Sequence, residues 1–241
     1  MVKVLIPSGA LGLGYDRAAL ARGIAQKPDI IAIDGGSTDS GPHYLGTGTS
    51  KYSRNSTKAE WRELMAARAE AGVPLVIGTA GTCGADDAVD WLVEITREIA
   101  AETGESLRLA VLKSGQDNQT MVAALRAGRI TPLPAAPEIS DTLLLECTNI
   151  VALAGAEQIQ EALNTGADII IAGRTTDTAI ISALPLARGC HAGGAWHGAK
   201  IGECGALATT SPNSGTIMIA FDAEGFTMTP MGAEALATPR T

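Results

Sequence analysis

Large aromatic side chains are scarce in this sequence of 241 residues, which contains 2 Phe, 3 Tyr and 3 Trp. A hydrophobic core must therefore be assembled mainly from Ala, Val, Ile and Leu. The hydrophobic fraction is nevertheless 46%, and so much apolar composition excludes an intrinsically disordered chain. A folded protein with a core of small aliphatic side chains is expected.

Long hydrophobic runs and clusters of basic residues are both missing. No run of about 18 apolar residues exists, so no segment is expected to span a membrane. Residues 1–7 are typical of a strand entering a glycine-rich turn rather than of a signal peptide, which favours a cytoplasmic protein. The 18 Lys and Arg are outnumbered by 26 Asp and Glu, a formal net charge of −8, so nucleic acid is not expected as a partner.

Cysteine is also infrequent, and its four copies are scattered without paired spacing, which indicates reduced thiols rather than disulfides. One set of zinc ligands is conceivable, namely Cys190, His191, His197 and Cys204. Their spacing matches no standard zinc site, so a divalent metal is not favoured.

Short β-rich runs alternate with helical stretches along most of the chain, which predicts an α/β fold: a mainly parallel twisted sheet flanked by helices, in one domain over residues 1–241. The end of the chain differs, because two apolar runs around a short turn predict a C-terminal antiparallel hairpin. The expected strands are residues 2–6, 29–33, 75–77, 107–112 and 168–172, with the hairpin at 215–221 and 226–230.

Capping residues predict where several helices begin and end. One helix should begin near Asp16, and a capping box of Thr57 with Glu60 should open another that ends at Gly72. An amphipathic helix is expected after residue 84, ending before Gly104, and another over residues 156–163. The proline-rich stretch 131–137 is expected to form an extended loop.

Four of the predicted strands end in polar or glycine-rich loops, at residues 8–14, 34–42, 78–84 and 173–177. In open α/β sheets, ligands bind beyond the carboxyl ends of parallel strands, where helix N-termini offer unpaired N–H groups. These loops are therefore expected to converge on one ligand site.

The loop at 34–42 is the most polar. Asp34 and Asp39 are candidate general bases or metal ligands, with Ser37 and Thr38 as hydrogen-bond partners. His43 follows the loop directly and is a further candidate for proton transfer. The alternative is that the two acids hold the loop itself through turn and backbone hydrogen bonds.

Glycine-rich loop 78–84 is suited to an anion, because small residues let a phosphate or carboxylate approach the backbone N–H groups. It contains no Walker motif, and a purely conformational role for its glycines is equally consistent with the sequence. The residues expected to bind substrate here are Gly78, Thr79, Gly81 and Thr82.

Arg174 follows a predicted strand directly, so its guanidinium is expected at the same edge as a bidentate clamp for a substrate carboxylate, with Asp177 nearby. The alternative is an internal salt bridge to Asp177 or Asp34.

A second concentration of reactive side chains lies at 196–205. If this segment is helical, His197, Lys200 and Cys204 share one face. Lys200 and Glu203 form either an acid/base pair or a local ion pair. Cys204 lacks an identifiable activating partner, which disfavours it as a nucleophile.

Three blocks of the sequence together resemble the bacterial acyclic terpene utilisation family: residues 34–46, 166–177 and 200–206. The first block is long and specific, and the resemblance extends over essentially the whole chain. It implies a role in small-molecule catabolism, since the family is named for citronellol and geraniol breakdown. The intermediates there are branched hydroxyacyl-CoA thioesters, and relatives sit in other carboxylate pathways. A CoA thioester is therefore a candidate substrate.

Members of that family run well beyond the predicted hairpin, to roughly twice the length expected of one domain. We therefore expect a second chain that completes the family's C-terminal half, together with oligomerisation. Thr241 is expected to mark the end of a fragment, of a separately encoded subunit or of a chain cleaved at that point.

Three functions follow as hypotheses. The leading one is a lyase or hydratase that acts on a small hydroxycarboxylate or its thioester: Arg174 and the N–H groups of 78–84 bind the anion, and Asp34 or Asp39 moves the proton. The second is an amide, lactone or thioester hydrolase activated by cleavage after Thr241. The third is a non-catalytic ligand-binding subunit of a larger enzyme.

Overall fold

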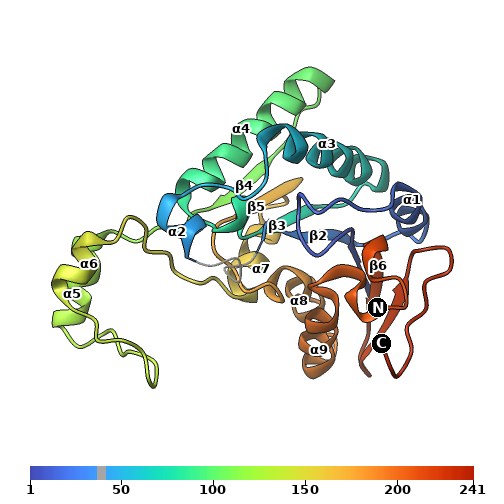
Figure 1. Ribbon diagram of the computed structural model, residues 1–241. Coiled ribbons are helices and arrows are strands. Elements are labelled where there is room, and N and C mark those ends of the chain that lie inside the picture. The colour runs from blue at the N-terminus through green and yellow to red at the C-terminus, as the bar shows by residue number, and fades with distance from the viewer. Residues whose placement is uncertain (37–41) are drawn as a thin grey trace.

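The computed structural model describes residues 1–36 and 42–241 (Figure 1). One sheet contains its strands in the order β4-β5-β3-β2-β1-β6-β7. Neighbours from β4 to β1 are parallel, whereas β6 runs antiparallel to β1 and pairs with β7 in a hairpin. The predicted fold class is confirmed. The strands are β1 (Val2–Ile6), β2 (Ile30–Asp34), β3 (Leu75–Gly78), β4 (Leu109–Leu112), β5 (Ile169–Ala172), β6 (Ile217–Phe221) and β7 (Phe226–Pro230).

Helices cover both faces of the sheet, as Figure 1 shows. One face is covered by α1 (Arg17–Ala25), α3 (Arg54–Ala71) and α4 (Asp86–Thr103). The other is covered by α7 (Ala156–Asn164), α8 (Ala179–Ala187) and α9 (Ala192–Gly202). Each central strand is therefore buried on two sides, which explains its continuous apolar sequence.

Small aliphatic side chains fill both core layers, as the composition predicted. Successive residues of a strand point to opposite faces, so Leu5 joins the layer under α1 while Val4 joins the layer over α9. Trp61 of α3 and Phe221 of β6 are large aromatic exceptions, and both are fully buried. The Trp61 indole N–H donates to Thr96 Oγ1 at 2.8 Å.

Two predicted helix features are wrong in detail. The helix α3 begins at Arg54 because the side chain of Ser53 caps it, accepting from Ser56 N at 3.2 Å, so Thr57 lies inside the helix and forms no capping box. The helix α9 ends at Gly202, so Cys204 does not share a helical face with His197 and Lys200. The predicted ends at Asp16, Gly72 and Gly104 are confirmed.

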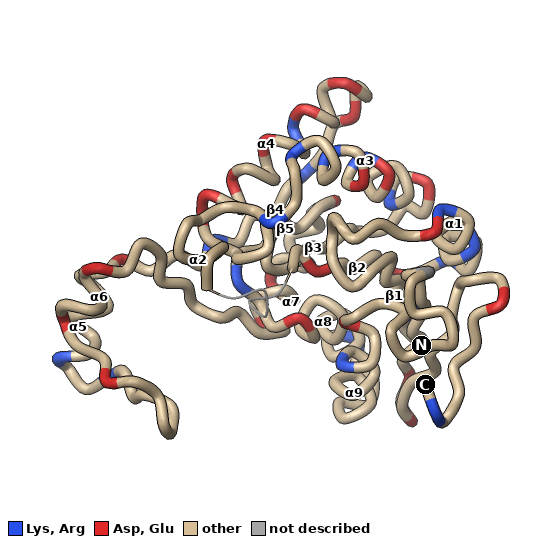
Figure 2. Tube along the Cα trace, in the orientation of Figure 1, with Lys and Arg blue, Asp and Glu red and all other residues tan. Residues whose placement is uncertain are grey.

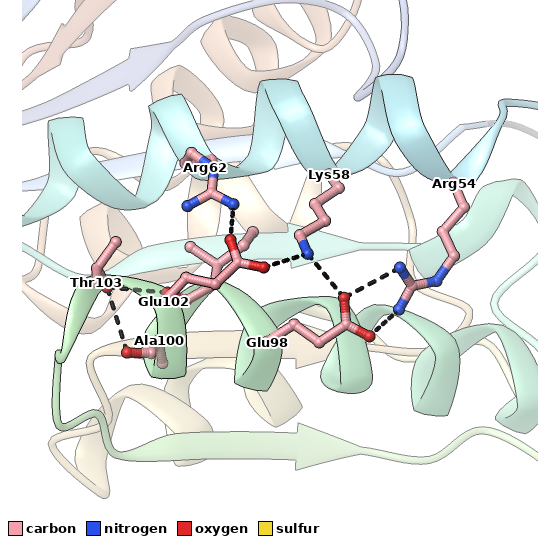
Figure 3. A network of polar contacts seen from close by, with 8 residues as sticks. Arg54, Lys58, Arg62, Glu98, Ala100, Glu102 and Thr103 are labelled. Atoms are coloured by element: carbon pink, nitrogen blue, oxygen red, sulfur yellow. Dashed lines mark hydrogen bonds and ion pairs between the residues drawn. The ribbon is translucent and has the colours of Figure 1, made fainter.

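A ladder of ion pairs joins α3 to α4 (Figure 3). Lys58 Nζ lies 2.9 Å from Glu98 Oε2 and 2.7 Å from Glu102 Oε1. Arg54 binds Glu98 and Arg62 binds Glu102 from either side. Figure 2 shows many acidic and basic residues over these helices. None of the helices in the described ranges combines the length and apolar character needed to cross a bilayer.

The segment between β4 and α7 projects from the body (Figure 1). It contains α5 (Asn118–Arg126) and α6 (Asp141–Glu146), and the proline-rich stretch 131–137 forms the loop between them. The other short elements of the described residues are α2 (His43–Thr47), η2 (Ala80–Thr82), η3 (Gly205–Ala208) and η4 (Pro212–Ser214).

Candidate functional site

The carboxyl ends of β1, β2, β3 and β5 lie at one edge of the sheet. The strands β3 and β5 are neighbours, yet α4 leaves β3 toward one face and α8 leaves β5 toward the other. Such a switch point is where ligands bind in open α/β sheets. Backbone hydrogen bonds tie the strand-end loops together, from Leu11 N to Asp34 O (2.8 Å), from Gly35 N to Gly78 O (2.7 Å) and from Thr79 N to Gly173 O (2.8 Å).

Asp34 is the last residue of β2 and only 5% exposed. Its carboxyl group accepts a hydrogen bond from Gly35 N at 2.9 Å. Burial raises the pKa of Asp34 well above its ordinary value, and the negative charge of Asp177 raises it further. The N–H of Gly35 and the positive charge of Arg174 oppose this rise in pKa. Asp34 can therefore hold a proton at a pH where an ordinary carboxyl group has lost it.

Arg174 and Asp177 follow β5 and lie close enough to Asp34 to act on its charge. Arg174 Nη1 lies 3.5 Å from Thr79 Oγ1, which joins the arginine to the loop after β3. Thr79 Oγ1 also accepts from Thr175 N at 3.4 Å. Thr79 and Thr175 are both fully buried. The structure thus brings Asp34, Arg174 and Asp177 together beside a buried threonine pair.

The loop from Thr79 to Gly84 has an unusual backbone. Thr79 and Thr82 have φ angles of +48° and +76°, which β-branched residues rarely adopt. A Cβ at Gly84 would lie 2.3 Å from Arg174 N, so only glycine fits where the two loops touch. Strain of this kind persists where the surrounding structure imposes it and is frequent at functional sites.

The other predicted residues of this loop have neighbours within the protein. Thr82 Oγ1 accepts from Lys51 N at 3.1 Å, Gly78 faces Thr175, and Gly81 faces Ala88. Their predicted contacts with substrate stay predictions.

Lys200 and Glu203, at the C-terminal end of α9, form an ion pair with each other. The Lys200 side chain is 72% exposed and the Glu203 side chain 8%. Cys204 comes next, and its backbone packs directly against Gly9 in the loop after β1. Burial raises the pKa of the Cys204 thiol, Glu203 raises it further, and Asp177 and Asp34 add to the rise. Cys204 therefore lies near the two aspartates as a neutral thiol.

Several predicted site residues are not among those brought together. Ser37, Thr38 and Asp39 lie outside the described residues. His43 begins α2, is exposed, and has the ring of Tyr44 edge-on at 5.2 Å between centroids.

The four conceivable zinc ligands occupy separate surroundings. Cys190 Sγ lies 3.5 Å from Phe221 O, and His191 caps α9 by accepting from Gly194 N at 2.9 Å. The His197 ring packs edge-on against Phe226. Residues 1–36 and 42–241 contain no group of three or more His, Cys, Asp or Glu arranged to hold a metal ion.

A family model described as acyclic terpene utilisation family protein AtuA matches residues 32–214. This chain belongs to that family. The match runs from β2 to η4 and includes Asp34, Arg174, Asp177 and Cys204, so the candidate site lies within the family's shared region. No curated protein and no solved structure matches the chain. Membership implies involvement of this protein in acyclic terpene utilisation.

The sequence analysis of this family member did not select one residue at the carboxyl-end edge of the sheet. Ser114 is 5% exposed, and its hydroxyl lies 3.4 Å from the carbonyl oxygen of Arg174. The signal was available, because Ser114 follows β4 as the other loops follow their strands. The spatial approach of Cys204 to Gly9 carried no such signal, since 195 positions separate them along the chain.

Proposed function

We propose that this protein is a hydro-lyase that adds or removes water on a small hydroxycarboxylate or its acyl-CoA thioester. The observation that carries the proposal is Asp34, a buried carboxyl group with a raised pKa beside Arg174 and Asp177. Asp34 is buried, and Asp177 acts on it as a negative charge; a protonated and a charged carboxyl group close together can divide acid and base roles between them.

Each of the three residues has one role in dehydration. Arg174 binds the substrate carboxylate or the thioester carbonyl oxygen. Asp177, the charged carboxylate, takes the proton from the carbon beside that carbonyl. Asp34, the protonated acid, gives its proton to the leaving hydroxyl group on the next carbon. A C–H and a C–O bond break, a C=C bond forms, and water leaves; hydration reverses every step.

Family membership supports an organic acid or thioester of a branched, terpene-derived chain as the substrate. The loop of residues 78–84 packs against the Arg174 backbone at Gly84, so an anionic group bound by Arg174 would lie next to this loop. Exposed Lys200 adds positive charge near Asp177.

The test assays the purified protein with branched 3-hydroxyacyl-CoA and 2-enoyl-CoA thioesters and the corresponding free acids, in D2O. We expect reversible water addition with deuterium incorporated at the carbon beside the carbonyl. Asp34→Asn should lower kcat by about 100- to 10,000-fold, as loss of a general acid does. Arg174→Ala should raise KM by about 10- to 100-fold, corresponding to one charge-assisted hydrogen bond.

Matched control variants lie at the opposite edge of the sheet, where Asp29 and Arg188 form an ion pair. Asp29→Asn and Arg188→Ala should leave both kinetic constants near the wild-type values. Release of free CoA without water addition would contradict the proposal and support a thioester hydrolase instead. Binding of the thioester without any turnover would replace it with a ligand-binding subunit.

A further inference from the structure

We call the projecting segment, residues 113–153, the arm. Its two ends are paired at the base, where Gln116 N donates to Ile150 O and Ala152 N donates to Ser114 O, both at 2.8 Å. Asp86 Oδ1 of α4 accepts from Gly115 N at 2.9 Å and fixes the base to the body. Beyond the base, α5 and α6 pack on each other, and neither packs extensively on another helix or strand of the described chain (Figure 1).

Two helices of 9 and 6 residues are too short to be stable by themselves. The helix α5 buries Val122 and Ala124, and α6 buries no residue. Both helices nevertheless have specific caps: Asp117 accepts from Thr120 N at 2.8 Å, and Ser140 accepts from Leu143 N at 3.2 Å. The sequence therefore specifies a helix pair whose own packing is insufficient, which points to further burial against another molecule.

The arm also presents apolar surface in two forms, a groove and exposed leucines. A groove of about 640 Å3 is lined by Gln119, Val122, Ala123, Arg126, Ala127 and Leu145. Leu143 of α6 and Leu133 of the connecting loop are 47% and 79% exposed. Exposed leucines next to an apolar groove are the two halves of a self-complementary contact, which a twofold axis would form twice.

The arm carries both basic and acidic side chains, so two arms can also match each other in charge. Arg129 follows α5, Glu138 precedes α6, and Glu146 is the last residue of α6. Arg126, at the end of α5, already pairs with Asp141 of the same arm at 2.7 Å. A second arm related by a twofold axis can place its basic end against the acidic ends of α6. The same acidic residues disfavour a nucleic acid or an anionic lipid surface as the occupant.

We propose that the arm is the self-association element of this protein, and that its occupant is the arm of a second copy of the same chain. The two helix pairs then form a four-helix bundle around Leu143, Leu145 and the groove. This inference is independent of the reaction catalysed.

The test measures molar mass by light scattering and native mass spectrometry over a wide range of protein concentration. Wild-type protein should have twice the chain mass of 24.6 kDa. Leu143→Glu places a charge on the protruding leucine, and Ala123→Glu places one in the groove wall. Each variant should halve the mass, and because both positions are exposed, circular dichroism and thermal unfolding of the body should stay unchanged.

Leu236→Glu is the matched control, since Leu236 is a 62%-exposed leucine far from the arm in sequence and should leave the dimer intact. A wild-type chain that is monomeric at every concentration would overturn the proposal. A dimer that persists in both arm variants would do so as well, because the second copy would then bind elsewhere.

Discussion

Asp34 combines a buried position with a titratable group, so the stability of the protein should depend on its protonation. Its native pKa is raised, mainly by burial and next by Asp177. The native state therefore retains a proton that the unfolded chain releases near pH 4, the ordinary range of Asp. The free energy of unfolding therefore falls as pH rises from about 4 toward the native pKa of Asp34.

The corresponding prediction concerns Asp34→Asn, which cannot ionise but retains an oxygen that can accept from Gly35 N. Urea unfolding between about pH 4 and pH 8 should show the variant gaining stability relative to wild type as pH rises. Parallel pH profiles for the two proteins would contradict the assignment of a raised pKa to this residue.

Gly84 is where the loops after β3 and β5 touch, and its φ is +68°. Gly72 has nearly the same φ, +67°, but nothing lies within 4 Å of a Cβ built there. Gly72→Ala should therefore cost only the left-handed backbone penalty of about 1–2 kcal/mol. Gly84→Ala should cost about 1–3 kcal/mol more, because the new methyl group meets the Arg174 backbone.

Denaturant unfolding of the two alanine variants measures this difference directly. Equal destabilisation of both would mean that the loops separate without penalty, and the close approach at Arg174 would then carry no structural constraint.

At the scale of elements, the ladder between α3 and α4 makes a prediction about acid and salt. Hydrogen bonds from Arg54 and then Lys58 lower the pKa of Glu98 to about 2. The stabilisation from Glu98 is therefore present above its ordinary pKa of 4.5 and is lost as pH falls toward 2. Glu98→Gln should destabilise the protein at neutral pH, with an effect that shrinks in acid and in added salt.

Thermal unfolding of wild type and Glu98→Gln at several pH values and salt concentrations tests this. Glu161→Gln, on α7 at the other face, serves as the comparison. A Glu98 effect that is independent of salt would show that packing, rather than charge, accounts for it.

The elements also show how far sequence reasoning extends. Each strand of the parallel sheet was found because it is a short apolar run between glycines, prolines or polar residues. The helix α8 was missed because its apolar sequence contains Pro185 and lacks a side-chain cap. The two arm helices were missed because each is short, with 9 and 6 residues, and its apolar residues are consecutive rather than spaced in a helical repeat.

The same limit applies to the site. Asp34, Arg174 and Asp177 were selected because they follow predicted parallel strands, and parallel topology alone brings such positions to one edge. Ser114 follows a predicted strand in the same way and could have been selected on the same ground. Cys204 required knowledge of where α9 ends and of its approach to Gly9. Long-range order of that kind depends on packing, which local sequence does not encode.

At the scale of the whole molecule, the body should fold without the arm helices. The base is closed by the Gly115–Val151 bridge, so replacing residues 118–146 with a short Gly/Ser loop leaves the sheet and its helices intact. We expect circular dichroism to show loss of helix only in proportion to the residues removed, with cooperative unfolding preserved. Loss of cooperative unfolding would mean that the arm contributes to the core.

Arg174 contacts both the candidate site and the base of the arm. The Arg174 side chain reaches the loop after β3. The Arg174 carbonyl oxygen accepts from Ser114 Oγ at 3.4 Å, in the arm base, and from Ala154 N at 2.9 Å, immediately after the arm. Ligand binding at Arg174 can therefore change the association of two arms, and association can change ligand binding. Whatever factor a ligand on Arg174 applies to the association of two copies, association must apply the same factor to the affinity for that ligand.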